Sequence, residues 1–520
     1  MEPLNTSRPT RVLTTDRAWP LHDTVASRSI EAIAAAALPP HTLMARAGMA
    51  LARLALAVAP GARRIWVAAG PGNNGGDGFE AAWHLHRAGM AVTVCWQGDP
   101  ARLPADAAAA YAQANGAHVP IVATLPSIDG GDVAIDALLG LGARRPPDAT
   151  LAGTVDALNR SRGVRLAVDL PTGLDADTGA VLGTAAVRAT HTLALLTLKP
   201  GLFTAQGRDH AGEVWFDALD VDPAPMGIAP SAWLAGPEPW QRVRPPRAHG
   251  GHKGRFGDVI VVGGAAGMTG AAVLAARSAL AAGAGRVFVC PLDPDSPMLD
   301  ANQPELMWRE AAWSQSRDVL RDATVVCGCG GGDAVAALLP ALLSCTARLV
   351  IDADALNAIA RDVSLQAMLR ARAGHGHATV LTPHPLEAAR LAGHLDAAMI
   401  QADRVAAARQ LADRWACTVL LKGSGTVIAV PDEPACINAT GNARLGSAGT
   451  GDVLAGWLAG LWSASRSARA VASVADVAKA AAWSHGLAAE SSDLAAPLVA
   501  SRLIERLAAT SCSAAPAAPR

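Results

Sequence analysis

Residues 446–452 have the sequence Gly-Ser-Ala-Gly-Thr-Gly-Asp and run directly into the apolar stretch 453–462. The glycines lack the Cβ atoms that keep a phosphate away from the backbone, so successive amides can turn inward at the start of a helix. Asp452 lies where that helix is expected to begin. A carboxylate repels phosphate, but it can take a proton from a hydroxyl that attacks phosphate. The stretch therefore predicts phosphoryl transfer to an alcohol, and a plain helix start with an acidic cap is the alternative.

A second phosphate-binding loop is predicted at residues 422–426, Lys-Gly-Ser-Gly-Thr. It lies between two predicted strands, 419–421 and 427–430, so its glycines can form a tight turn that presents amides, a lysine and two hydroxyls. Such a sequence on its own is more often a plain hairpin. Residues 438–442, Asn-Ala-Thr-Gly-Asn, then lead into the first loop. The spacing of these segments favours a nucleotide cleft.

The composition indicates a well-packed protein without a dominant charge. At 520 residues the chain is long enough for roughly two to four domains. Its 44 Lys and Arg nearly balance 45 Asp and Glu, so no overall field attracts nucleic acid or anionic lipid. Residues 1–40 lack the apolar core of a secretory signal, and the 8 cysteines are too few for a disulfide framework. Apolar runs end before the roughly 20 residues that a membrane span needs. We expect a cytoplasmic protein that binds neither nucleic acid nor membrane.

Seven prolines between residues 223 and 246 mark a domain boundary, because they cannot belong to a continuous helix or a central strand. We predict a first domain at 1–230, a Pro-rich linker at 231–250 and a second domain at 251–510. In both halves, short β-branched runs alternate with Ala-rich helical patterns, which is typical of α/β domains with a parallel sheet. The predicted strands are 64–69, 91–96, 133–138, 164–169 and 193–198 in the first half, and 258–262, 286–290, 324–327, 349–351, 379–381 and 419–421 in the second.

The first half has its own candidate ligand site. Residues 71–78, Pro-Gly-Asn-Asn-Gly-Gly-Asp-Gly, lie between a predicted strand and a helix at 79–87, where a turn can hold phosphate. The stretch lacks the Rossmann GxGxxG order, its oxygens suit a cation or ribose hydroxyls, and a structural Asn-Gly turn is the alternative. Asp136, Asp169 and Lys199 each lie at the end of a predicted strand, where parallel sheets bind ligands. Together with the turn at 71–78, these make four polar strand ends at one edge of the sheet. Their convergence favours a ligand site over side chains that are simply solvated.

From about His252 to Leu507 the chain resembles the ADP-dependent NAD(P)H-hydrate dehydratases of the ribokinase-like superfamily. The resemblance is carried by HKGRFG at 252–257, MTGAA at 268–272, AGAG at 282–285, PELM at 304–307, IDADALN at 351–357, LTPHP at 381–385 and the two phosphate loops. It implies that the hydroxyl of hydrated NADH or NADPH is phosphorylated from ADP, and that phosphate then leaves to restore the dihydropyridine. Asp452 would be the base, and magnesium would accompany ADP.

The same resemblance implies the ligand contacts of the second half. The implied contacts to the hydrated cofactor are Ala271, Gly330, His384 and Asp452, and those to the adenine nucleotide are Lys422, Gly423, Ser424, Gly425, Thr426 and Gly451. A turn histidine bonded to backbone is the alternative for His384. Asp352 and Asp354 are left open between helix caps and ion ligands. The chain departs from the family at Leu386, at 443–445, and at Cys329 and Gly331, which stand in a loop more often written Gly-Pro-Gly-Leu-Gly.

From about Leu21 to Leu219 the chain looks like the NAD(P)H-hydrate epimerases, which interconvert the R and S forms of the hydrated cofactor; the block LMARAG at 43–48 is part of this resemblance. The implied substrate contacts are Asn73, Asn74, Gly75, Gly76, Asp77, Gly140, Leu141, Gly142, Ala143, Arg144, Arg145, Pro146 and Asp169. Asn74, Asp136 and Thr172 would hold a potassium ion, and Asp169 with Lys199 would handle protons. Ala45, Leu141 and Thr172 replace the glutamate, threonine and serine that are usual in the family.

Together these resemblances predict a bifunctional repair enzyme with two α/β domains. The first is expected to be a Rossmann-like three-layer sandwich and the second a ribokinase-like α/β/α domain. One alternative is an ATP-dependent kinase for a vitamin precursor, with the first half as a regulatory module. Another makes the first half a binding or interaction domain without chemistry. We also expect a homo-oligomer.

Overall fold

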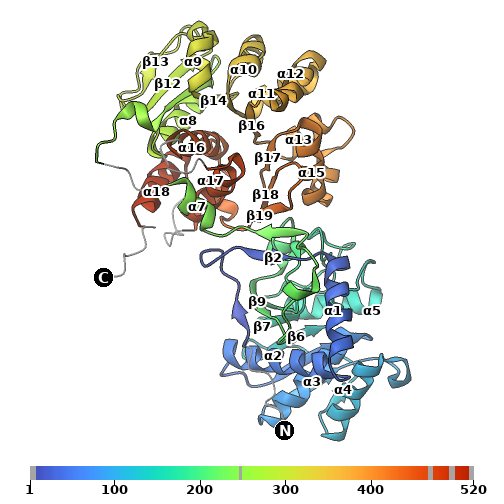
Figure 1. Ribbon diagram of the computed structural model, residues 1–520. Helices are drawn as coiled ribbons and strands as arrows, with labels where there is room; N and C mark the ends of the chain where they lie inside the picture. The colour runs from blue at the N-terminus through green and yellow to red at the C-terminus, as the bar shows by residue number, and fades with distance from the viewer. Residues whose placement is uncertain (1–7, 245–248, 466–471, 491–497, 514–520) are drawn as a thin grey trace. The chain divides into compact units, whose positions relative to one another are not determined.

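The computed structural model describes residues 8–244, 249–465, 472–490 and 498–513, and the chain forms two compact units (Figure 1). One unit holds the chain up to Leu13 together with Trp19–Trp233, and the other holds Thr14–Ala18 and the chain from Leu234 onward. Pro245 and Pro246 of the predicted linker lie outside the described residues. Over the residues described, no helix is long and apolar enough to cross a membrane. The predicted α/β class with two domains is confirmed.

The N-terminal unit is built on one 8-stranded sheet. Its strand order is β1 (Thr10–Arg11), β9 (Glu213–Asp217), β8 (His191–Leu195), β7 (Val164–Val168), β6 (Val133–Ala137), β3 (Ile65–Ala69), β4 (Val92–Cys95) and β5 (Ile121–Val122). All neighbours are parallel except β1 and β9. The chain proceeds from β3 through β4 to β5 and then returns to β6 on the other side of β3. A crevice is therefore expected beyond the carboxyl ends of β3 and β6.

Helices cover both faces of this sheet. Helices α2 (Thr42–Val58), α3 (Asn73–Arg87) and α4 (Ala105–Gly116) pack beside one another, and residues of all three share one core with Val67 of β3. On the opposite face, Val155 of α5 (Ala149–Arg160) packs in a second core with Ala68, the next residue of β3. Helix α1 (Thr24–Ala37) adds Ile30 to the first core. The alternation of Val67 and Ala68 between the two cores follows from the two-residue period of a strand.

Helix α3 begins earlier than the predicted residue 79, so most of the Asn-Gly-rich stretch forms its first turns. Gly75 and Gly76 explain this start. A Cβ atom on Gly75 would overlap the carbonyl oxygen of Gly70, and one on Gly76 would lie 2.6 Å from Cε of Met44. These glycines therefore let α3 begin directly against β3 and α2.

In the C-terminal unit the sheet runs in the order β13 (Met307–Trp308), β12 (Arg286–Pro291), β11 (Asp258–Gly263), β14 (Thr324–Cys327), β15 (Arg348–Ile351), β16 (Ala378–Leu381), β17 (Thr418–Leu421), β18 (Thr426–Ala429) and β19 (Ala435–Asn438). Neighbours are parallel from β13 to β17 and antiparallel from β17 to β19. The strand order reverses between β11 and β14. Ligand-binding loops are expected beyond the carboxyl ends of these two strands.

The C-terminal sheet is also covered on both faces. Val259 and Val261 of β11 belong to one core and Ile260 and Val262 to the other, as the period of a strand requires. The first core takes residues from α8 (Thr269–Ala281), α16 (Thr450–Ser465), α17 (Val474–Ala489) and α18 (Ala500–Ser513). The second takes residues from α10 (Leu339–Cys345), α11 (Ala353–Arg361), α12 (Val363–Gly374), α13 (Pro385–Ala392) and α15 (Arg404–Trp415) (Figure 1). The unit is thus an α/β/α sandwich.

The described part of the Pro-rich stretch contributes to a core. It forms β10 (Ala232–Leu234) and α7 (Glu238–Val243), with Pro239 in the first turn of α7, where a missing N–H is tolerated. Trp240 is 4% exposed, and its ring stacks on Trp457 with the ring centroids 6.2 Å apart. The stretch from Leu234 to Arg244 therefore packs as part of the C-terminal unit.

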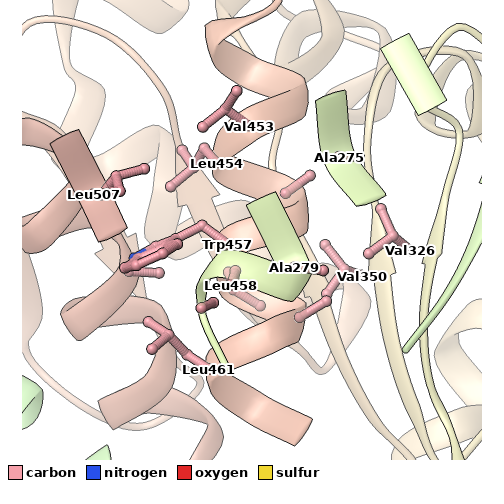
Figure 2. Packing of buried hydrophobic residues seen from close by; sticks show 14 of the residues in the cluster. Ala275, Ala279, Val326, Val350, Val453, Leu454, Trp457, Leu458, Leu461 and Leu507 are labelled. Atoms are coloured by element: carbon pink, nitrogen blue, oxygen red, sulfur yellow. The ribbon is translucent and has the colours of Figure 1, made fainter. Parts of the chain in front are cut away.

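The close packing of α8 against α16 holds the predicted phosphate loop in place (Figure 2). On α16, Trp457, Leu458 and Leu461 are fully buried, and Ala275 and Ala279 of α8 lie beside this helix. Gly456 and Gly460 are one turn apart on α16. A Cβ atom on Gly456 would overlap the carbonyl oxygen of Ala275, and one on Gly460 would overlap that of Ala279. The two backbones approach closely because both glycines lack side chains.

We expect Gly456→Ala to lower the free energy of unfolding by about 1–3 kcal/mol through overpacking. This would happen although alanine favours a helix over glycine by about 1 kcal/mol. The matched control is Gly270→Ala on α8, where the position is exposed and an added Cβ meets nothing within 4 Å. Urea unfolding of both variants checks the prediction. Equal unfolding midpoints for the two variants would contradict the close approach of the helices.

Candidate active sites

The glycine-rich stretch that precedes α16 forms a closed loop at the start of this helix. Thr450, the first helical residue, donates its hydroxyl to the carbonyl oxygens of Leu445 (2.7 Å) and Ser447 (2.9 Å). Gly449 has a φ of +85°, a conformation that glycine adopts without strain. Beneath the loop, Nε2 of buried His485 donates to the carbonyl oxygen of Thr450 (3.0 Å), and burial lowers the pKa of His485 to about 4. A neutral histidine therefore supports the loop from α17.

Asp452 is the third residue of α16 and lies in a cluster of charged groups. Asp352, which follows β15, is 2% exposed, and its Oδ1 accepts hydrogen bonds from Lys422 Nζ (2.7 Å) and Thr382 Oγ1 (2.8 Å). A Cβ atom on Gly451 would lie 3.5 Å from Lys422 Nζ, so the amine lies beside the start of α16. Burial, followed by the charge of Asp352, raises the pKa of Asp452 to about 6. A carboxylate with such a pKa is suited to accept a proton near neutral pH.

The hairpin between β17 and β18 contains the second predicted phosphate loop. Gly423 and Gly425 have φ values of +144° and +64°, and Thr426 donates its hydroxyl to the carbonyl oxygen of Gly423 (3.2 Å). Below the turn, buried Arg404 donates to the carbonyl oxygens of Leu421 (3.2 Å) and Lys422 (3.1 Å). The segment is thus a hairpin, and its shape depends on a buried arginine that no motif of the sequence indicates. Its first residue, Lys422, is the one that joins the charged cluster.

Ala271 and Gly330 meet although they are far apart in the sequence. A Cβ atom on Gly330 would lie 2.9 Å from Cβ of Ala271 and 2.8 Å from the carbonyl oxygen of Met268. Gly330 has a φ of +57°, and its carbonyl oxygen accepts a hydrogen bond from Ala265 N (2.7 Å). These loops follow β11 and β14, where the strand order reverses. The absence of a side chain on Gly330 therefore lets these two segments approach closely at the expected ligand edge of the sheet.

His384 is the N-cap of α13. Its Nδ1 accepts hydrogen bonds from the amides of Leu386 (3.2 Å) and Glu387 (3.4 Å), while Glu387 accepts from the amide of His384 (2.8 Å). The other carboxylate oxygen of Glu387 lies 3.2 Å from Nε2 of His384, and Oε2 lies 4.0 Å from Lys422 Nζ. The observed contacts of His384 are therefore those of the alternative, a turn histidine bonded to backbone, here as a helix cap. Glu387, which the sequence analysis missed, places this half-exposed histidine beside the charged cluster.

Cys329 lies next to the catalytic candidate Asp452. It follows β14 and is fully buried, its Sγ donates to Oδ2 of Asp352 (4.0 Å), and the sulfur lies within 4.8 Å of a carboxylate oxygen of Asp452. Burial, together with the two carboxylates, raises the pKa of the Cys329 thiol well above its ordinary value. The thiol is therefore protonated, and it donates to Asp352. The sequence left Asp352 open between a helix cap and an ion ligand; it stands at the N-cap of α11, but its side chain makes no capping hydrogen bond. For Cys329 the sequence showed only a departure from the family, and the strand-end rule applied to β14 could have pointed to it.

In the N-terminal unit, a cavity of about 960 Å³ opens beyond the carboxyl ends of β3 and β6. The predicted site residues that line it are Asn73, Asn74, Asp77, Gly140, Leu141, Gly142, Ala143, Arg144, Arg145, Pro146, Asp169 and Lys199. The structure thus brings together segments that follow four strands. Gly75 and Gly76 are not among the lining residues, because they face Gly70 and Met44. Asp136 and Thr172 are buried and do not line the cavity either.

Asp169 and Lys199 form an ion pair at the cavity. Lys199 is 2% exposed, and its Nζ donates to Oδ1 of Asp169 and to the carbonyl oxygens of Leu195 (2.9 Å) and Thr197 (2.9 Å). Asp169 has a φ of +66°, and its Oδ1 also accepts from Leu195 N (3.1 Å). The carboxylate is thereby held in one orientation, at a strained backbone position of the kind often found at functional sites.

Two further carboxyl groups line the same cavity. Burial raises the pKa of Asp77 well above its ordinary value, and the charges of Asp169 and Glu31 add to this effect. Burial and Asp169 likewise raise the pKa of Glu31, which comes from α1. Two carboxyl groups with raised pKa values therefore lie at the same cavity as Asp169. Sequence reasoning missed Glu31 because no motif surrounds it.

Asp136 and Thr172 are joined by direct hydrogen bonds. Thr172 donates its amide (2.8 Å) and its hydroxyl (2.7 Å) to the Asp136 carboxylate, which is 1% exposed and also accepts from Leu138 N (3.3 Å). Burial raises the pKa of Asp136 to about 6. Asn74 lies beside Gly140, which follows β6, because a Cβ atom on Gly140 would be 2.8 Å from Asn74 Oδ1. Asp136 belongs to β6, while Asn74 and Thr172 come from the segments that follow β3 and β7.

Comparison with known proteins finds relatives for both units. A family model described as NAD(P)H-hydrate dehydratase matches residues 259–508, and one described as YjeF-related protein N-terminus matches residues 40–201. The bifunctional NAD(P)H-hydrate repair enzyme Nnr of Escherichia coli strain K12 is 36% identical over 471 residues, which cover 86% of this chain and 85% of that protein. The enzyme of the same name from Coxiella burnetii is 34% identical over 459 residues, covering 86% of this chain and 90% of that protein.

A solved structure is also similar to part of this chain. It is the ADP/ATP-dependent NAD(P)H-hydrate dehydratase of Bacillus subtilis, co-crystallized with ATP/Mg2+, which is 25% identical and covers 52% of this chain and 94% of its own, with a TM-score of 0.42. The sequence relatives extend over both units, so the resemblance indicated by the motifs is confirmed for both halves, and the vitamin-kinase alternative is not favoured. The chain belongs to the family of bifunctional NAD(P)H-hydrate repair enzymes.

Proposed function

We propose that the C-terminal unit dehydrates the S form of hydrated NADH or NADPH with ADP as the phosphoryl donor. The position of Asp452 at the start of α16, beside Lys422 and Gly451, carries this proposal. The oxygen of the ring hydroxyl attacks the terminal phosphorus of ADP, and AMP leaves. Asp452 takes the proton of this hydroxyl during the attack. Phosphate is a better leaving group than hydroxide. Its departure, with loss of a proton from the neighbouring ring carbon to solvent, then restores the double bond of the dihydropyridine ring.

The surrounding residues have distinct roles in this proposal. Lys422 and the amides of Gly423, Ser424, Gly425, Thr426 and Gly451 hold the phosphates of the nucleotide. Ala271 and Gly330 leave room for the hydrated ring, and His384 contacts the substrate from the start of α13. The ion pair between Lys422 and Asp352 supports this arrangement, because it fixes the amine beside the helix that presents Asp452. Magnesium bound with ADP would screen the negative charge of the phosphates.

We also propose that the N-terminal unit interconverts the R and S forms in its cavity. The Asp169–Lys199 pair handles protons, while Asn73, Asn74, Asp77 and residues 140–146 bind the substrate; Gly75 and Gly76 place the first turn of α3. Asn74, Asp136 and Thr172 would hold potassium. Their oxygens suit this ion, because the buried Asp136 carboxylate accepts from three neutral donors and a cation would balance its charge. The cytoplasmic location and the homo-oligomer stay predictions.

A mixture of R and S hydrated NADH, incubated with the protein, ADP and magnesium, tests both activities at once. We expect the absorbance of regenerated NADH to account for both epimers, because the first unit supplies S hydrate to the second. Recovery that stops when the S form is consumed would contradict the epimerase role. No NADH from either epimer would contradict the dehydratase role.

A further inference from the structure

We propose that Cys329, Asp352 and Asp452 form a binding site for a thiophilic divalent cation such as Zn²⁺ or Cd²⁺. The ligand atoms of these three residues, one sulfur and two carboxylate oxygens, all lie within 4.8 Å of one another. Within the described ranges, this is the one group of three or more His, Cys, Asp or Glu residues found this close together. The three residues come from the loops after β14 and β15 and from the first turn of α16.

The orientation of Asp352 favours the site. Its Oδ1 accepts hydrogen bonds from Lys422 (2.7 Å) and Thr382 (2.8 Å), while its Oδ2 is the oxygen that faces Cys329 Sγ at 4.0 Å. A cation between Oδ2 and Sγ therefore does not have to displace the lysine. Zinc bonds to sulfur and oxygen are about 2.0–2.3 Å long, so ligand atoms around one ion lie roughly 3–4 Å apart. The ligand atoms of this group, which all lie within 4.8 Å of one another, would therefore move closer together around a bound ion.

The charges at the site also suit a divalent ion. Two carboxylates and a thiolate carry three negative charges, and the amine of Lys422 offsets one of them. A divalent cation balances the remainder, which matters because Cys329 and Asp352 are buried. On binding, the S–H bond of Cys329 breaks, a sulfur–metal bond forms and the proton passes to water. No electron transfer is involved.

The position of Cys329 is fixed by its surroundings. The residue belongs to the core that α8 and α16 share, and its carbonyl oxygen accepts a hydrogen bond from Gly264 N (3.0 Å). The sulfur is therefore held beside the two carboxylates before a cation arrives. Asp452 is partly exposed and gives the cation a route from solvent. The site prefers thiophilic cations because a sulfur ligand binds soft ions more tightly than it binds magnesium.

Occupation of the site would inhibit dehydration, and this consequence rests on the proposed role of Asp452 as the base. A carboxylate bound to Zn²⁺ or Cd²⁺ cannot take a proton from the substrate hydroxyl. Magnesium, a hard ion, does not compete for the thiolate. The enzyme would thus lose dehydratase activity in the presence of free thiophilic cations while retaining the epimerase activity of the other unit.

Titration of the full chain with Cd²⁺, followed by the ultraviolet thiolate-to-metal absorption, tests the site without relying on activity. We expect one equivalent to produce the band in the wild type, and Cys329→Ala to abolish it. Cys327→Ala is the matched control, because Cys327 is equally buried two residues away but faces the other core. Asp452→Asn should weaken binding by about tenfold or more. Cys329→Ser keeps the side-chain volume and replaces the alanine variant if that protein does not fold.

A band that persists without Cys329, or no band in the wild type, overturns the proposed site. In a parallel assay, Cd²⁺ should block ADP-dependent dehydration by the wild type, and Cys327→Ala should remain equally sensitive. If the wild type shows no dehydration even without Cd²⁺, the proposed function fails. The absorbance titration still decides whether the cation site exists.

Discussion

Replacing Asp452 by asparagine is expected to lower kcat for dehydration by about 10²–10⁴-fold, because an amide cannot accept the hydroxyl proton. The protein should remain folded. Burial raises the pKa of Asp452, so its charged form is less stable in the folded protein than in the unfolded chain, and asparagine removes that cost. Epimer exchange should continue at the wild-type rate. ADP-dependent NADH formation and exchange of the two hydrates are measured on the same preparation.

Asp476→Asn is the matched control for this variant. Asp476 is the third residue of α17, as Asp452 is of α16, and it pairs with Arg242 at the surface. The control therefore removes a similar helix-start charge, worth about 0.3–1 kcal/mol, without touching the charged cluster. We expect its dehydratase activity to equal that of the wild type. Loss of both activities in a folded Asp452→Asn protein would argue against two separate sites.

The pH dependence of dehydration checks the same assignment. The base is active when it is deprotonated, and the pKa of Asp452 is about 6. Below this pH, kcat/KM of the wild type should therefore fall by about tenfold per pH unit, and it should level off above it. A profile that stays flat down to pH 5 would exclude Asp452 as the base.

The core strands could be predicted because runs of β-branched and apolar residues fit a buried strand better than a helix or a loop. Residues 324–327 are β-branched or apolar and form β14 over the predicted bounds. The strands at the sheet edges, such as β1 and β5, have two residues each, which is too short for a recognisable pattern. The start of α3 was missed because glycine and asparagine indicate a turn by propensity. Here packing of Gly75 against Gly70 decides the conformation instead.

In the candidate sites, too, some residues could be predicted from the sequence and others could not. Asp452, Lys422 and Asp169 stand in recognisable motifs at strand or helix ends, so the sequence could indicate them. Their partners could not be inferred in this way. Glu31 reaches its cavity from a helix without a motif, and the contact between Cys329 and Asp452 joins segments more than 100 residues apart, which only the sheet topology brings together.

Asp169→Asn is expected to abolish epimer exchange and to destabilise the N-terminal unit. Asparagine tolerates the positive φ of residue 169, so the backbone need not change. The substitution leaves the buried ammonium of Lys199 without a negative partner, which typically costs about 3–5 kcal/mol. Loss of the carboxylate should slow exchange by about 10²–10⁴-fold. Chromatographic separation of the R and S hydrates measures the exchange, and urea unfolding measures the stability.

The double variant Asp169→Asn with Lys199→Met separates these two effects. It removes the unpaired charge together with the carboxylate, so stability should return toward that of the wild type while exchange stays lost. Dehydration of S hydrate should be unchanged in both proteins, because Asp452 and its cluster belong to the other unit. If the double variant regained exchange, the pair would serve stability alone. An unchanged exchange rate in folded Asp169→Asn would remove this carboxylate from the mechanism and leave Asp77 and Glu31, the two carboxyl groups of the cavity with raised pKa values, as the next groups to test.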